Sequence, residues 1–145
     1  SGEVLQNYSA RSSLSAPNVP LPALKLNGTK VLVVDDSPDN QALIRAILNH
    51  AGAVIETANN GAEAVEMALR GNFDIVLMDL QMPVMDGYEA TRVLREQGYR
   101  RPILALTAHA MKEERDRTLA SGFDDHVTKP IDQKALIRTI AGHSA

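Results

Sequence analysis

A short apolar run that ends on a carboxylate constrains the fold of this chain more than any other stretch. Residues 75–78 (Ile-Val-Leu-Met) have the length and composition of a β-strand buried on both faces, and Asp79 follows directly. Pro83 cannot donate a backbone hydrogen bond and fixes its own φ angle, so the chain must leave the sheet near this residue. A carboxylate at the end of a buried strand is costly unless another group pairs with it, so the rest of the chain must supply a partner for Asp79.

Short apolar runs alternate with segments of helical spacing from residue 30 onward. The predicted strands cover residues 30–34, 54–57, 75–78, 102–106 and 126–128. The predicted helices cover residues 38–51, 62–70, 86–97 and 112–121, and a last helix follows Asp132. Ser37 with Pro38 marks a helix start, as does Asp86. Leu43 and Leu69 are expected on the buried faces of the first two helices.

This alternation predicts an α/β fold. Strands followed by helices at this pitch imply a parallel sheet with right-handed crossovers and helices on both faces. We therefore expect a doubly wound (βα)5 flavodoxin-like sandwich with strand order 2-1-3-4-5.

Residues 1–29 differ in composition from the rest of the chain. Serine, proline, asparagine and glycine interrupt every period there, which is typical of an extended linker. We expect a solvated linker over 1–29, including Leu26, and one folded domain over 30–145. The opening Ser1-Gly2 resembles the scar of a cleaved tag.

Composition excludes several classes of function. The 145 residues contain no cysteine, so disulfides, thiol catalysis and cysteine-bound metals are excluded. The net charge of −3 implies no direct affinity for nucleic acid or an anionic membrane surface. No apolar run approaches about 18 residues, so we expect no transmembrane helix and no membrane contact by this segment.

Polar residues follow four of the five predicted strands. Asp35 and Asp36 follow the first strand, Asp79 the third, Thr107 the fourth and Lys129 the fifth. Since the carboxyl ends of parallel strands meet at one edge of a sheet, these side chains should converge. Three crowded carboxylates require either a retained proton or a cation. Oxygen ligands that include carboxylates suit Mg²⁺, which also binds phosphate.

Such a site suits phosphoryl transfer. Asp79 is the central carboxylate and hence the candidate nucleophile, with Lys129 and the Thr107 hydroxyl placed to contact phosphate oxygens. Asp36 and, less directly, Asp35 would hold the metal together with Asp79, and the backbone carbonyl of Gln81 could be a further ligand. The small Ala108 would leave room for the phosphate.

Four motifs in order resemble the receiver domain of two-component response regulators. They are Asp35-Asp36, Asp79-x-x-Met82-Pro83-x-Met85-Asp86-Gly87, Thr107-Ala108 and Lys129-Pro130. The resemblance covers about residues 30–142. It implies that Asp79 accepts a phosphoryl group from a phosphohistidine on a partner, with Mg²⁺. It also implies that Thr107 reorients toward the phosphate and that Lys129 contacts it beside a cis bond to Pro130.

Three positions that vary in this family distinguish the chain. Gln81 and His109 flank the path of an attacking water, so the resemblance implies that they tune the loss of the phosphoryl group. His126 stands where the family often has Tyr or Phe as the aromatic partner of the Thr107 switch. A histidine can rotate as such a switch does, but it can also hydrogen-bond instead.

Two other functions fit these residues less well than a receiver does. A phosphohydrolase that works through an aspartyl-phosphate needs a general acid two residues after the nucleophile, and Gln81 cannot serve as one. A flavin or nucleotide carrier needs a Gly/Ser/Thr-rich loop after the first strand, whereas residues 35–39 are acidic. A receiver is no conventional enzyme, because it catalyses only its own phosphorylation and dephosphorylation.

The resemblance leaves the parent protein open. We favour the C-terminal receiver of a hybrid sensor histidine kinase, which would pass its phosphoryl group to a histidine phosphotransfer domain. This segment is expected in the cytoplasm, where it could be the cytoplasmic part of a membrane-bound kinase. A stand-alone or truncated response regulator is the alternative. We expect a monomer or weak homodimer. Residues 112–117 with His126 form the expected regulated surface, and the first helix, with Asn40, Gln41 and Arg45 exposed, the expected phosphotransfer surface.

Overall fold

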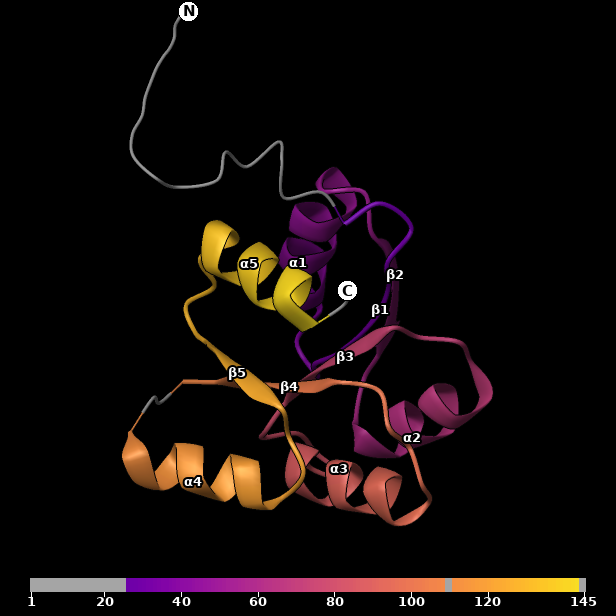
Figure 1. The fold of residues 1–145 in the computed structure, drawn as a ribbon, viewed down its shortest axis with the longest axis vertical. Helices are drawn as coiled ribbons and strands as arrows, with labels where there is room; N and C mark the ends of the chain where they lie inside the picture. Colours follow the sequence, from indigo (N-terminus) through magenta and orange to yellow (C-terminus); the bar gives the residue numbers. More distant parts are fainter. Residues whose placement is uncertain (1–25, 109–110, 144–145) are drawn as a thin grey trace, which may run out of the picture.

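The computed structural model describes residues 26–108 and 111–143, which form a single α/β sandwich (Figure 1). Its strands are β1 (Lys30–Val34), β2 (Val54–Ala58), β3 (Ile75–Asp79), β4 (Ile103–Thr107) and β5 (Asp125–Thr128). Its helices are α1 (Pro38–His50), α2 (Gly61–Arg70), α3 (Gly87–Glu96), α4 (Lys112–Ala120) and α5 (Gln133–His143). All strand pairs are parallel, in the order β2-β1-β3-β4-β5, so the predicted fold is confirmed.

The sheet separates two hydrophobic cores. Alternate residues of β1 face opposite sides: Val31 packs in the core under α1 and α5, and Leu32 packs in the core under α2 and α3. Figure 1 shows α1 and α5 on one face of the sheet and α2, α3 and α4 on the other. Every residue of β3 and of β4 is buried, as expected for central parallel strands.

Leu26, which was assigned to the linker, packs against the domain instead, and residues 28 and 29 hydrogen-bond to it through the backbone. Leu26 is 2% exposed, lies in the core beside α1, and donates a backbone hydrogen bond to the carbonyl of Ala51 at 2.8 Å. The turn between α1 and β2 leaves an apolar gap that this leucine fills, which no local pattern could indicate. The ordered domain therefore includes residues 26–29, and the rest of the predicted linker lies outside the described residues.

Two leucines expected to be buried are exposed. Leu43 is 47% and Leu69 is 43% exposed. On α1 the fully buried contacts are Ile44 and Leu48, which lie four residues apart on one line of the helix. A helix turns about 100° per residue, so Leu43 lies at the margin of the stripe that faces the sheet.

The helices differ in how firmly their first turns are held. The Ser37 hydroxyl accepts a hydrogen bond from the Asn40 N–H at the start of α1, and Asp86 accepts one from the Glu89 N–H at the start of α3, as predicted. Helix α4 follows Met111, which offers no side-chain cap. Within the described parts of the chain, no helix is long and apolar enough to cross a membrane.

Candidate functional site

The sequence-predicted acidic residues meet at the carboxyl edge of the sheet. Asp35 and Asp36 follow β1, and Asp79 is the last residue of β3, the neighbouring strand. Carboxylate oxygens of these three residues lie within 4.8 Å of one another. The fold therefore produces one acidic cluster from segments more than 40 residues apart in sequence.

Asp79 is nearly buried and is paired with Lys129. The Lys129 ammonium lies 3.3 Å from an Asp79 carboxylate oxygen and 3.6 Å from one of Asp35. Burial and the charge of Asp35 nevertheless raise the pKa of Asp79, while Lys129 and the backbone N–H of Gln81 act to lower it. Lys129 is thus the partner that a buried carboxylate needs, but one ammonium serves two carboxylates.

Asp35 is held in place, whereas Asp36 reaches solvent. The Asp35 carboxylate accepts hydrogen bonds from the backbone of Ser37 at 2.9 Å and from the side chain of Asn40 at 3.3 Å. Asp36 is exposed. Three carboxylates gather here, and the Lys129 ammonium contacts two of them. Because all the candidate ligands are oxygens, the arrangement fits a hard divalent cation.

The loop after β3 is shaped by backbone constraints next to Asp79. A Cβ on Gly87 would overlap the backbone carbonyl of Asp79, so only glycine allows α3 to begin this close to the strand. The Gly87 N–H donates to the carbonyl of Leu80 at 3.1 Å. Between them, Val84 adopts φ +70° and is 83% exposed, an unusual conformation for a β-branched residue.

Thr107 and Lys129 are joined across the last two strands. The Lys129 N–H donates to the carbonyl of Thr107 at 2.7 Å, and the peptide bond from Lys129 to Pro130 is cis. Thr107 is 5% exposed, and Ala108 beside it is exposed. These residues border a cleft of about 240 Å³ that also contains Asp79.

Three further residues line the cleft that the sequence did not indicate as site residues. Tyr88 of α3 and Glu114 and Arg117 of α4 line it. The Tyr88 hydroxyl donates a hydrogen bond to the Glu114 carboxylate at 2.5 Å, and the Arg117 guanidinium lies 3.9 Å from the centre of the Tyr88 ring. The three-residue spacing of 114 and 117 indicates that they share one face of α4. The sequence does not indicate that this face lies toward α3.

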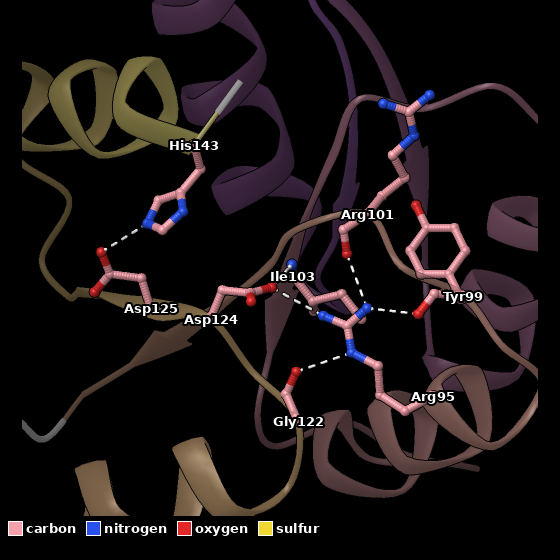
Figure 2. A network of polar contacts seen from close by, with 8 residues as sticks. All are labelled: Arg95, Tyr99, Arg101, Ile103, Gly122, Asp124, Asp125 and His143. Atoms are coloured by element: carbon pink, nitrogen blue, oxygen red, sulfur yellow. Dashed lines mark hydrogen bonds and ion pairs between the residues drawn. The ribbon is translucent and has the colours of Figure 1, made fainter. Parts of the chain in front are cut away.

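His126 does not line this cleft. Its ring nitrogen lies 3.7 Å from the carboxylate of Asp125, and its side chain is 27% exposed. His143 also pairs with Asp125, at 3.0 Å (Figure 2). His109 lies outside the described residues.

The first helix presents fewer exposed polar residues than predicted. The Gln41 amide donates to the carbonyls of Asp35 and Ala58, and the Asn40 amide to the Asp35 carboxylate, so both side chains are only partly exposed. Arg45 is exposed, as is Leu43. Gln41 is less exposed than predicted because the carbonyls of Asp35 and Ala58, at the ends of β1 and β2, need hydrogen-bond donors and the Gln41 amide supplies one.

Comparisons with known proteins agree with this geometry. The family model described as "Response regulator receiver domain" matches residues 31–141. The chain is 42% identical over 124 residues to the "Sensor protein GacS" of Pseudomonas syringae pv. syringae, covering 82% of this chain and 14% of that protein. The chain therefore spans only a small part of that relative.

Two solved structures share the fold and differ in what they contain. The receiver domain of the sensor histidine kinase PA1611 from Pseudomonas aeruginosa PAO1, with magnesium in its active-site cleft, is 39% identical, with a TM-score of 0.74 over 80% of this chain and 97% of that one. The receiver domain of Ssk1 in complex with the histidine phosphotransfer protein Ypd1, from Saccharomyces cerevisiae, gives 32% identity and a TM-score of 0.76 over 81% and 90%.

Proposed function

The chain belongs to the response regulator receiver domain family, whose members act as phosphoacceptors in two-component signalling, and we propose that Asp79 is the acceptor here. The observation that carries this proposal is the position of Asp79. It ends the central strand, borders the cleft, and has the Lys129 ammonium 3.3 Å away. No other carboxylate of the acidic cluster lines that cleft.

The transfer itself requires little from the protein beyond positioning and charge. A carboxylate oxygen of Asp79 attacks the phosphorus of a phosphohistidine, and the phosphorus–nitrogen bond breaks. The electron pair remains on the imidazole nitrogen, which then takes up a proton. Lys129 offsets the charge of the phosphoryl oxygens, and the Thr107 hydroxyl is placed at the same cleft to donate a hydrogen bond.

Mg²⁺ is the cofactor that this arrangement suits. Asp35, Asp36 and Asp79 supply carboxylates, and the backbone carbonyl of Gln81 is a further proposed ligand. When bound, the ion neutralises phosphoryl oxygens and the surplus charge of the cluster. The related PA1611 receiver domain, which contains magnesium in its cleft, supports this proposal.

Loss of the phosphoryl group is proposed to depend on the residues around the cleft. Gln81 is exposed beside Asp79, where its side chain can restrict or orient an attacking water. His109 is proposed to act from the other side, and the Thr107–His126 pair to relay the change to α4, β5 and α5.

We place the chain in a phosphorelay as part of a longer kinase. The similarity to GacS and to the PA1611 receiver supports a parent that is a hybrid sensor histidine kinase, whose own phosphohistidine would donate and whose receiver would work in the cytoplasm. The relative Ssk1, solved with a phosphotransfer protein, supports a histidine phosphotransfer domain as the next acceptor. The exposed Leu43 and Arg45 of α1 offer that partner an apolar and a cationic contact beside the site.

Intact-mass spectrometry after incubation with acetyl phosphate, with and without Mg²⁺, tests the proposal. We expect a gain of one phosphoryl group that requires Mg²⁺ and is absent from Asp79→Asn. Asp86→Asn is the matched control, because Asn caps α3 as well as Asp does and Asp86 lies outside the acidic cluster. Persistence of the phosphoryl mass in Asp79→Asn would overturn the assignment.

A further inference from the structure

Tyr88 connects the phosphoacceptor strand to α4. Its backbone follows Gly87, which lies directly against the carbonyl of Asp79. Its hydroxyl donates to Glu114 at 2.5 Å, and its ring packs edge-on against Phe123, with centroids 6.1 Å apart. Burial and the neighbouring Glu114 raise the pKa of Tyr88 to about 12, so the hydroxyl remains a donor at neutral pH.

We propose that the hydrogen bond from Tyr88 to Glu114 holds α4 in the arrangement of the unphosphorylated domain, and that a phosphoryl group on Asp79 opposes this bond. Tyr88 is then a positioning residue that couples the site to α4. The proposal rests on the proposed role of Asp79.

The charges around the cleft give the direction of this coupling. Phosphorylation replaces the single negative charge of the Asp79 carboxylate with an acyl phosphate of roughly two negative charges, so the site gains about one negative charge. Glu114 lines the same cleft as Asp79, so its carboxylate is repelled, whereas the Arg117 guanidinium on the same helix is attracted. Because Arg117 lies over the Tyr88 ring, both changes act on the contacts of Tyr88. The phosphorylated state therefore disfavours the present arrangement of these three side chains.

Among residues 26–108 and 111–143, few other contacts hold the first turns of α4. Its N-cap residue Met111 makes no capping hydrogen bond, and Thr118 is the one buried residue of the helix. The Thr118 hydroxyl donates to the carbonyl of Arg115 within the same helix. A single contact such as Tyr88 to Glu114 can therefore decide where the first half of α4 lies.

The chain just after α4 is held by a separate group of contacts. The Arg95 guanidinium donates to the carbonyl of Gly122 at 3.0 Å and to the carboxylate of Asp124 at 2.8 Å. It also donates to the carbonyls of Tyr99 and Arg101, as Figure 2 shows. This cluster, which we call the Arg95 clamp, fixes the C-terminal end of α4 and leaves the N-terminal end to respond.

The residue at position 126 does not duplicate this role. His126 pairs with Asp125 on β5 and does not line the cleft. Tyr88 is the aromatic residue that borders the cleft with Thr107. Tyr88 therefore offers a contact with α4 that adds to the relay proposed for Thr107 and His126.

Affinity for beryllofluoride, a stable phosphoryl mimic, measured with Mg²⁺ by 19F NMR, tests the proposal. Reciprocal linkage requires that a contact weakened by the mimic also weakens the binding of the mimic. We expect Tyr88→Phe to bind it about fivefold more tightly, the size of one net hydrogen bond. Glu114→Gln should also bind more tightly, and the double variant should gain no more than Tyr88→Phe alone.

Tyr99→Phe is the matched control. It also removes one tyrosine hydroxyl, but that hydroxyl is buried without a hydrogen-bond partner among the described residues. Tyr99 contributes its backbone carbonyl to the Arg95 clamp and is not among the cleft-lining residues. Its affinity for the mimic should match that of the wild type. Equal affinity of Tyr88→Phe and wild type, or an equal gain in Tyr99→Phe, would overturn the proposal.

Hydrogen exchange separates coupling from simple loss of stability. Without the mimic, amides of the first two turns of α4 should exchange faster in Tyr88→Phe, while those of α1 should be unchanged. Faster exchange throughout the domain would overturn the proposal. Failure of the proposed acceptor role gives a different result, because the mimic would then bind wild type and Asp79→Asn equally.

Discussion

Helices α1 and α4 both begin beside the candidate site, but the protein holds them very differently. Helix α1 has a serine cap, a proline in its first turn and two fully buried side chains, Ile44 and Leu48. Helix α4 has no side-chain cap and buries only Thr118. The carboxylates proposed to hold the metal lie next to the firmly held helix. The helix proposed to respond is the one whose position costs little to change.

The largest difference should appear when each helix loses an apolar side chain. Ile44→Ala leaves a cavity in the core, so we expect it to lower the free energy of unfolding by about 3 kcal/mol. Leu119 on α4 is 59% exposed, and Leu119→Ala should change it by less than about 0.5 kcal/mol. Urea denaturation measures both, and similar losses for the two variants would refute the comparison.

The Arg95 clamp should be the strongest attachment near α4. Arg95→Ala leaves the Asp124 carboxylate and three carbonyls without this donor, and we expect a loss of about 2 kcal/mol. Arg92→Ala is the control, because its ion pairs with Glu89 and Glu96 are exposed and should contribute less than about 0.5 kcal/mol. Thermal unfolding followed by circular dichroism gives both values. A small effect of Arg95→Ala would contradict the inference that these contacts anchor the end of α4.

The helix caps give a matched pair of smaller changes. Ser37→Ala removes the hydroxyl that caps α1 and should cost about 1 kcal/mol. Met111→Ala removes no capping bond from α4 and should be nearly neutral. If chemical denaturation showed that Met111→Ala is the costlier variant, α4 would be better anchored at its start than the structure indicates.

The smallest effect concerns pH. The folded-state pKa of Asp79 is raised, chiefly by burial, so ionisation destabilises the fold and the associated stability is lost as pH rises through that pKa. Without Mg²⁺ at pH 7, Asp79→Asn should therefore be more stable than wild type, by up to about 1 kcal/mol. The difference should disappear below the ordinary aspartate pKa of 3.8. Unfolding measured across this range checks the sign, and a destabilised variant at pH 7 would contradict it.

Local patterns in the sequence were sufficient for the order of the elements and for most of the site. The run at 75–78 and the cap at Ser37 are signals within a few residues, and the structure agrees with both. Asp35, Asp79 and Lys129 could be brought together without coordinates, because a parallel sheet places the ends of all its strands at one edge.

The errors occurred where a side chain depends on a distant segment. Leu26 is buried because the turn after α1 leaves a gap, and Gln41 turns inward because carbonyls of Asp35 and Ala58 lie within reach. These contacts are not between residues three or four apart on one helix, so helical periodicity could not indicate them. The exposure of Leu43 likewise depends on the rotation of α1 against the sheet.

The sequence alone determined a receiver-type sheet and the acidic residues, threonine and lysine at its edge. Strand and helix periodicities are local signals, and a parallel sheet places the ends of all its strands at one edge. The tertiary structure alone decided that one ammonium is shared by Asp35 and Asp79, and that Tyr88, Glu114 and Arg117 close the cleft. These contacts depend on how α4 packs toward α3, and the polar sequence of α4 specifies no packing face. Which side chains of α3 and α4 can contact each other is determined only by the relative positions of the two helices.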